Sequence, residues 1–217
     1  MAKSRRIDVG GLLSFSEEQM QLLIAVWRSL ATGRAVGQLR LESIISDLGA
    51  DQETAETFLR GQSERDEQGR IAGLLGLSLK DHPHGFLVNG VKMSTWCAMD
   101  TLFLPAMLGQ TARVTSRSPV SDVEVSLTVT PEGVQDLQPT EAVVSLKIID
   151  PDAADLTCAE GIQSSLCQHV LFFASRQEAL QWTGDRKDID IVSVADGFEL
   201  ALQMWGKGRA WPVVAKP

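Results

Sequence analysis

The sequence lacks the long hydrophobic run that a membrane-spanning helix requires. Such a helix needs roughly 20 consecutive apolar residues, whereas the longest apolar stretch, Trp96–Leu108, is shorter and contains Asp100. The basic N-terminus is not followed by an apolar core with a small-residue cleavage site, so we expect no secretory signal. We therefore expect a cytoplasmic protein without a membrane partner.

Cysteine and positive charge are also scarce. The 217 residues include three cysteines, and this odd number does not make a disulfide framework, so free thiols are expected. Lys and Arg number 20 against 28 Asp and Glu, which gives a net charge of −8. This balance argues against a general polyanion-binding surface, and we expect no nucleic-acid partner.

Several familiar catalytic motifs are missing. There is no Gly-rich phosphate loop, no Gly-x-Ser-x-Gly elbow and no His-Glu-x-x-His pair. His82 and His84 lie in a turn with Pro83, and the sequence supplies no nearby partners to complete a zinc site. A hydrophobic content of 44% with 22% charged residues is typical of a folded globular protein.

The first part of the chain predicts a winged-helix-like helical module over residues 1–80. A helix, a Leu-Gly-Ala turn and a further helix form a helix-turn-helix pattern, and two strand-like segments follow. Residues 1–16 are expected to form a loose arm. The predicted elements are a helix capped by Ser16 and stopped by Gly33, helices over Leu39–Leu48 and from Asp51, and strands Ile71–Leu75 and Phe86–Val88.

The second part, residues 81–217, predicts a catalytic α+β domain. Val123–Val129 alternates apolar and polar residues, which is the periodicity of a strand. Strands and helices are mixed without regular alternation, so we expect a mixed, mostly antiparallel sheet with helices. The tail, Gly206–Pro217, is expected to fray. The other predicted elements are strands Val143–Ile149, His169–Ala174 and Ile189–Val194, and helices Glu178–Trp182 and Asp196–Trp205.

Cys97 and Asp100 are the first pair that could carry chemistry. They are three residues apart, so they share a face if a helix starts here. A helix N-terminus would stabilise the Cys97 thiolate, and a neighbouring carboxylate can exchange protons with a thiol or a bound substrate. In a simpler interpretation, Cys97 is only a small buried apolar residue.

Cys167 and His169 form a second candidate pair, just before an apolar run. Cys167 could supply another thiol or fill the core, and His169 could be a base or a ligand. For His169 we favour a hydrogen-bonded structural role. Cys158 lies in a loop-like stretch, and its nine-residue separation from Cys167 matches no short metal-ligand spacing, so we expect it to be incidental.

Several segments together resemble the alkylmercury (organomercurial) lyase family. The longest and most specific is Trp96–Gly109, WCAMDTLFLPAMLG, which Thr111–Ser116 continues. Val125–Pro131 is similar to the family's next strand, and Cys167–Ser175 resembles the segment that bears its second catalytic cysteine. The resemblance spans about residues 17–205.

The resemblance implies protonolysis, in which R–Hg–X becomes a hydrocarbon and Hg(II). It implies a catalytic trio of Cys97, Cys167 and Asp100, with the two thiolates capturing the soft metal. Asp100 would carry a proton from a thiol to the departing carbon. An apolar surround would raise the pKa of Asp100 and contact the organic group. The residues expected there are Trp96, Phe103 and Leu104.

No resident cofactor is implied, because Hg(II) is a product that Cys97 and Cys167 hold. A mercuric reductase or small thiols would accept it. The sequence departs from many relatives at two places: Gln168 replaces a cysteine that follows the catalytic one, and a cysteine near Ser118 is missing. Neither position belongs to the implied trio.

Two alternatives remain open. One is a helix-turn-helix regulator that responds to mercury, and the other is a relative that binds metal without catalysis. Against the regulator, the predicted recognition helix, Asp51–Arg60, carries more acids than bases. Such a surface is poorly suited to DNA phosphates.

Overall fold

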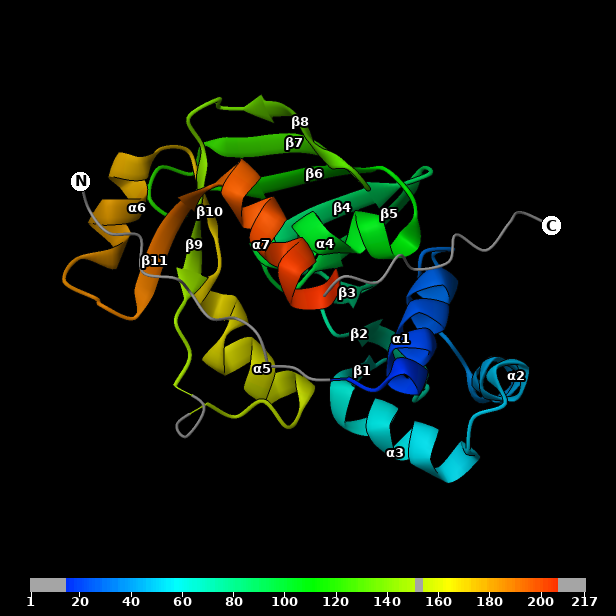
Figure 1. Cartoon of the computed structure of the whole chain (residues 1–217). Helices are drawn as coiled ribbons and strands as arrows, with labels where there is room; N and C mark the ends of the chain where they lie inside the picture. Colours follow the sequence, from blue (N-terminus) through cyan, green and yellow to red (C-terminus); the bar gives the residue numbers. More distant parts are fainter. Residues whose placement is uncertain (1–14, 151–153, 207–217) are drawn as a thin grey trace.

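The computed structural model describes residues 15–150 and 154–206 (Figure 1). Within these ranges the chain forms an eight-stranded sheet and a three-stranded sheet with helices packed around them. All the strand pairs of both sheets are antiparallel, which confirms the predicted α+β class with a mostly antiparallel sheet. The predicted arm and tail fall mainly on residues 1–14 and 207–217, which lie outside the described residues.

The described chain begins with three helices, and capping residues and glycines near them fix where each helix starts or stops. In α1 (Glu17–Leu30), Ser16 Oγ accepts the Gln19 N–H and the Gln19 side chain accepts the Ser16 N–H, so two otherwise unpaired donors are satisfied. The predicted stop follows at Gly33, which has a φ of +79°. The next two predicted helices are α2 (Gln38–Leu48), which ends at a left-handed Gly49, and α3 (Gln52–Gln62), which Asp51 caps.

Trp27 joins these helices to the larger sheet. Its side chain is fully buried, and its Nε1–H donates to the carbonyl of Leu74 at 2.8 Å, at the end of β2 (Ile71–Leu74). Val36, between α1 and α2, exchanges two backbone hydrogen bonds with Ile71. The helical segment is therefore built onto the edge of the sheet.

The larger sheet runs through both predicted parts of the chain. Its strands follow the order β1-β2-β3-β5-β4-β6-β7-β8, so strands from before and after residue 80 are hydrogen-bonded to one another. In β6 and β7, alternate residues are buried, as strand periodicity predicts. The remaining bounds are β1 Ser63–Arg65, β3 Leu77–Ser78, β4 His84–Val88, β5 Val91–Thr95, β6 Ala112–Arg117, β7 Glu124–Thr130 and β8 Gly133–Gln138.

The smaller sheet has the order β10-β9-β11. Its central strand is β9 (Val143–Lys147), with β10 (Phe172–Phe173) on one side and β11 (Ile189–Ser193) on the other. The helix α6 (Arg176–Thr183) packs on β9 and β11. These elements agree with the predicted strands at 143 and 189 and the predicted helix at 178.

Two local predictions before β10 are wrong. The loop-like stretch at Cys158 is the start of a helix, α5 (Ala159–Ser165). The predicted strand His169–Ala174 begins instead as a single 3₁₀ turn, η1 (Cys167–His169), and only β10 is extended. The physical reason is Ser145. Its backbone N–H still pairs with the Leu171 carbonyl at 3.0 Å, but its hydroxyl accepts the Leu171 N–H at 3.0 Å and donates to the His169 carbonyl at 2.8 Å, so the ladder stops there.

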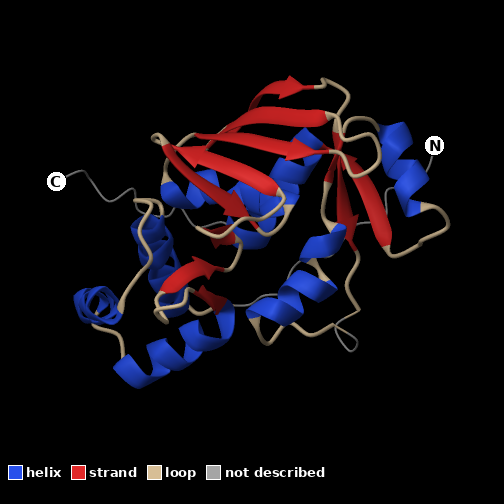
Figure 2. Cartoon of the chain, turned by 180° about the vertical axis from the view of Figure 1, so that it is seen from behind, coloured by secondary structure: helices blue, strands red, loops and turns tan. Residues whose placement is uncertain are grey.

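A buried helix, α4 (Ala98–Leu108), lies at the centre of the molecule. Every residue in it except Ala106 is buried, and it is apolar on all sides because protein encloses it. The last helix, α7 (Val194–Gly206), packs against it, and Figure 2 shows the strands of the larger sheet lying over these helices. In the described ranges, no helix is both long and apolar enough to cross a membrane.

Replacing Trp27 with Phe should destabilise the whole protein. The variant leaves the buried Leu74 carbonyl without its donor, and an unsatisfied buried polar group costs roughly 1–3 kcal/mol. Urea unfolding measures this loss. The control is Leu39→Ala, whose side chain is 83% exposed, and it should change stability by less than about 0.5 kcal/mol. Equal stabilities of Trp27→Phe and wild type would contradict the proposed link between helices and sheet.

Candidate active site

The N-terminus of α4 places Cys97 beside Asp100. Cys97 is the N-cap residue, with an extended backbone (φ −142°, ψ 170°), and Asp100 is the third residue of the helix. Asp100 Oδ2 accepts the backbone N–H of Cys97 at 2.8 Å. This is the capping geometry that acidic residues adopt at helix N-termini, and it holds the carboxylate on the side of the thiol.

Backbone contacts bring the second cysteine to the same place. The N–H of Ala98, the first residue of α4, donates to the carbonyl of Val170 at 3.0 Å. Val170 in turn donates its N–H to the carbonyl of Cys167 at 3.1 Å, which closes the η1 turn. Cys167 is therefore held against the start of α4, although it is distant in sequence.

Cys97, Asp100 and Cys167 form one buried cluster. Their sulfur and carboxylate atoms all lie within 4.8 Å of one another, and the three residues are only 2%, 8% and 3% exposed. Among residues 15–150 and 154–206, this is the only group of three or more His, Cys, Asp or Glu side chains close enough to share a metal ion. Two thiols of this kind match the preference of soft metals such as mercury.

Burial keeps both thiols protonated at rest. It raises the pKa of Cys97 well above its usual value, and the Cys167 thiol and the charge of Asp100 raise it further. For Cys167, the contact with the Cys97 thiol lowers the pKa, but burial and the charges of Asp100 and Glu64 outweigh it and raise the pKa overall. The backbone N–H of Asp100, in the first turn of α4, lowers the pKa of Cys97 as expected, but desolvation of the charged form outweighs this effect.

Asp100 is shifted in the direction expected from its apolar surroundings. Burial raises its pKa from 3.8 to about 6, against the opposing effects of the Cys97 hydrogen bonds and the charge of His82. At neutral pH the carboxylate is therefore mostly ionised while its two thiol neighbours are protonated. A group with a pKa this close to neutrality can both accept and return a proton.

The cluster opens into an apolar cavity of about 70 Å³. Trp96 and Phe103 line it, as predicted for contacts with an organic group, whereas Leu104 does not line it and is fully buried in the core. Besides Asp100, Lys147 is the one charged residue among the described lining residues. The others are Leu75, Gly76, Met99, Leu146, Ile162, Leu166, Val170, Leu200, Met204 and Trp205.

Gly76 allows the carboxylate to sit where it does. Its φ is +100°, and a Cβ atom at this position would lie 2.6 Å from Asp100 Oδ1, so any side chain would displace Asp100. Its carbonyl also accepts the Trp96 N–H at 2.9 Å, just before Cys97. The turn between β2 and β3 therefore forms one wall of the site.

Glu64 is a charged neighbour of the site that sequence reasoning missed. Burial would raise its pKa, but hydrogen bonds from His82 and Ser78 outweigh burial and lower the pKa to about 2. Gln163 Nε2 also donates to it at 3.1 Å, which links β1 to α5, the helix before Cys167. No local sequence signal marks this residue, because its partners come from distant segments.

The other candidate residues take structural positions. His82 pairs with Glu64, and His84 is buried with its Nδ1 2.8 Å from Ser116 Oγ, where burial lowers its pKa to about 3. His169 contacts Arg186 through Nδ1 at 3.2 Å, and burial lowers its pKa. Cys158 is the N-cap of α5, where its sulfur accepts the Gly161 N–H, and it is outside the cluster.

Two buried thiols beside a carboxyl group, lining an apolar cavity, make a site suited to a soft metal. Residues 77–206 match the family model for alkylmercury lyase. The alkylmercury lyase of Pseudomonas putida is 41% identical over 187 residues, which cover 85% of this chain and 82% of that protein. That of Staphylococcus epidermidis is 36% identical over 166 residues, covering 76% and 73%.

The chain belongs to the alkylmercury lyase family, a family of enzymes that cleave carbon–mercury bonds. A solved structure, the mercury-bound form of MerB2, superposes with a TM-score of 0.70 at 21% identity, covering 88% of this chain and 93% of that one. At this identity the likeness shows a shared fold. The mixed α+β architecture of this chain therefore matches that of a solved structure.

One equivalent of Hg(II) should protect Cys97 and Cys167 from alkylation and leave Cys158 reactive, because only the first two share a cluster. Alkylation followed by peptide mass mapping measures this. The control variant Cys158→Ser should still bind one equivalent. Protection of Cys158 together with only one of the other cysteines would contradict the shared site.

Proposed function

We propose that this protein cleaves the carbon–mercury bond of organomercurial compounds by protonolysis, giving a hydrocarbon and Hg(II). The observation that carries the proposal is the buried cluster of Cys97, Asp100 and Cys167 at the end of an apolar cavity. The thiols would bind mercury, the cavity would hold the organic group, and the carboxyl group would move the proton.

Mercury capture would use the two thiols in turn. The first cysteine exchanges its proton for mercury and releases the original ligand X as HX. The second cysteine then adds its sulfur to the same mercury. A second thiolate raises the electron density on the metal and weakens its bond to carbon, while the softness of sulfur keeps the metal bound.

Asp100 would carry the proton of the second thiol. Its carboxylate lies within 4.8 Å of both sulfurs and is mostly ionised at neutral pH, so it can accept that proton as sulfur binds mercury. It then delivers the proton to the departing carbon. The balance is R–Hg–X plus two thiols giving R–H, HX and Hg(II) bound to Cys97 and Cys167.

Product release needs an external acceptor, because two thiolates bind Hg(II) tightly. We propose small thiols or a mercuric reductase as acceptors, and the cytoplasm as the location in which free thiols persist. The proposed cycle uses no resident cofactor. Mercury enters as substrate and leaves as product, and the proton comes from the protein's own thiols.

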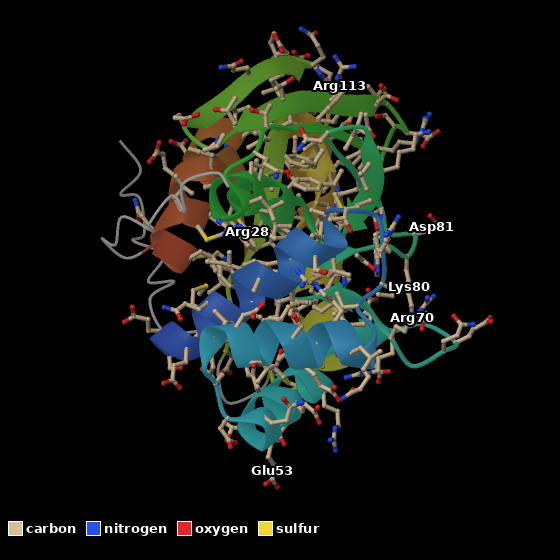
Figure 3. All side chains as sticks on the ribbon, turned by 90° about the vertical axis from the view of Figure 1, so that its right-hand side faces the viewer. Arg28, Glu53, Arg70, Lys80, Asp81 and Arg113 are labelled. Atoms are coloured by element: carbon tan, nitrogen blue, oxygen red, sulfur yellow. The ribbon has the colours of Figure 1, made fainter. Side chains whose placement is uncertain are left out.

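We further propose that residues 1–80 form a winged-helix-like unit that supports the catalytic part, residues 81–217, rather than reading DNA. The hydrogen bond of Gln62 with Thr157 and the pairing of β3 with β5 support this role, since both attach residues 1–80 to the catalytic part. Figure 3 faces these helices: Glu53 projects from α3, and Arg70 and Lys80 project from the loops beside β2 and β3. Mixed charge of this kind supplies little attraction for phosphates.

A buried carboxyl group beside the two thiols favours the lyase over a regulator or a metal-binding relative. Two cysteines alone are able to hold mercury, so neither alternative needs a buried acid. Keeping a carboxyl group in an apolar site is costly, as its raised pKa shows. A role in proton transfer explains why the site contains a carboxyl group despite this cost.

Asp100→Asn should bind mercury but lose turnover. The amide keeps the size and polarity of the side chain but cannot carry a proton, and general acid–base groups typically contribute roughly 10²–10⁴-fold. We expect a loss in this range or above in single-turnover release of benzene from phenylmercury, with unchanged mercury stoichiometry. The matched control is Asp51→Asn, which caps α3 away from the site and should keep full activity. Near wild-type release by Asp100→Asn would show that another group donates the proton.

Turnover should also rise with pH through about pH 6. The pKa of Asp100 is raised to about 6, and only its ionised form can take the thiol proton, so activity is lost as the pH falls below this value. The pH profile of kcat/KM measures this. The residual activity of Asp100→Asn should lack this limb, and its persistence in that variant would assign the limb to another group.

A further inference from the structure

Glu64 joins the larger sheet to the helix that precedes Cys167. It lies in β1, and its side chain is only 12% exposed. Its Oε1 accepts the Nε2–H of Gln163 at 3.1 Å, and Gln163 lies in α5, four residues before Cys167. Among residues 15–150 and 154–206, this is the only side-chain hydrogen bond between α5 and a strand of the larger sheet. The bond therefore bears on the position of α5 and of the cysteine that follows it.

The carboxylate of Glu64 is itself held from the side of the sheet. Ser78 Oγ–H donates to its Oε2 at 2.5 Å, and His82 Nε2 lies 3.0 Å from its Oε1. Gly73 is its partner across the pair of β1 and β2, and a Cβ atom at Gly73 would collide with Oε2 of Glu64. These contacts fix the carboxylate in place, so Gln163 donates to an acceptor that cannot move freely.

The charge of Glu64 excludes it as a proton carrier. Burial would raise its pKa, but the hydrogen bonds from His82 and Ser78 lower the pKa to about 2. At neutral pH its carboxylate is therefore ionised and too weak a base to take a proton from a thiol. Its effect on the reaction must come from what it holds rather than from proton transfer.

The position of α5 matters because both sulfurs must reach one mercury atom in the proposed cycle. The Cys167 sulfur lies within 4.8 Å of the Cys97 sulfur. Ile162 and Leu166, on either side of Gln163, line the apolar cavity. A displacement of α5 would therefore change the separation of the sulfurs and the wall of the cavity together. Misplacing a reacting group by about 1 Å can cost roughly 10²-fold in rate.

We propose that Glu64 is a positioning residue, which holds α5 against the larger sheet through Gln163 and so keeps the sulfurs of Cys167 and Cys97 within reach of one mercury atom. This role rests on the proposed lyase function. It adds to the reacting cluster a residue that touches neither the metal nor the organic group. The paired contact also predicts that the two side chains act as a unit.

Two measurements test this role, both in a Cys158→Ser background in which only the thiols of the cluster remain. One is single-turnover release of benzene from phenylmercury. The other is the affinity for phenylarsine oxide, which condenses with two neighbouring thiols and releases water. This affinity depends on how closely the two sulfurs are held. It therefore reports their separation without cleavage of a carbon–mercury bond.

Glu64→Gln should lower both the rate and the arsenical affinity by roughly 10- to 100-fold. The amide has one acceptor oxygen where the carboxylate serves Ser78, His82 and Gln163, so the bond to α5 is weakened. Loss of the charge alone acts in the opposite direction. The charge of Glu64 raises the pKa of Cys167, so its removal would favour the thiolate that binds metal.

The reciprocal double variant, Glu64→Gln with Gln163→Glu, exchanges donor and acceptor and restores a hydrogen bond between the two positions. It should recover most of both losses. The matched control is Glu67→Gln, which makes the same change at an exposed residue in the turn after β1 and should equal the background protein. If Glu64→Gln does not fold, as judged by circular dichroism, Gln163→Met removes the same bond from the side of α5 and should lower both quantities.

Unchanged rate and arsenical affinity in the folded variant would overturn the positioning role. Losses that the reciprocal double variant does not restore would also overturn it, because Glu64 would then not act through Gln163. The lyase function fails separately. A background protein that binds the arsenical through both thiols but releases no benzene would overturn that function, and the arsenical affinities would still decide whether Glu64 sets the separation of the sulfurs.

Discussion

The structure of the site depends on one hydrogen bond, from the backbone N–H of Cys97 to the carboxylate of Asp100 at the buried start of α4. An acid in an apolar core is stable only where its oxygens find donors. The helix N-terminus supplies this donor, and in doing so it fixes the carboxylate beside the thiol. Two neighbouring segments leave this geometry undisturbed. Gly76 has no side chain that would displace the carboxylate, and the carbonyl of Val170 accepts the N–H of Ala98 at the start of the helix.

Burial gives the three reacting groups their protonation states. It raises the pKa of both cysteines and brings that of Asp100 to about 6. The site at rest therefore holds an ionised carboxylate beside two protonated thiols. In the proposed mechanism, mercury reverses this distribution, because it replaces the thiol protons and makes them available for transfer. In that mechanism the apolar surround that shifts these pKa values would also receive the organic group, so one set of residues would serve both acid–base tuning and substrate binding.

Local signals in the sequence predicted most of the helices but not the site's assembly. Ser16, Gly33 and Asp51 act on neighbouring residues, and the helices that they delimit were found. The sequence does not predict the turn at Cys167, because the Ser145 hydroxyl, from another strand, binds the His169 carbonyl and the Leu171 N–H in place of backbone partners. Glu64 gave no signal, since it acts through long-range contacts. The proximity of Cys97 to Cys167 was expected only from the family resemblance, because it depends on a backbone contact between distant segments.

The most direct test of the account is a single turnover of ethylmercury with stoichiometric protein in D₂O. The thiol protons exchange with solvent, so we expect ethane with one deuterium, and one Hg(II) retained by Cys97 and Cys167. This result would show that the protein's exchangeable protons reach carbon while its two thiols keep the metal. Mercury bound by both cysteines without release of ethane, or release of unlabelled ethane, would contradict protonolysis at this site.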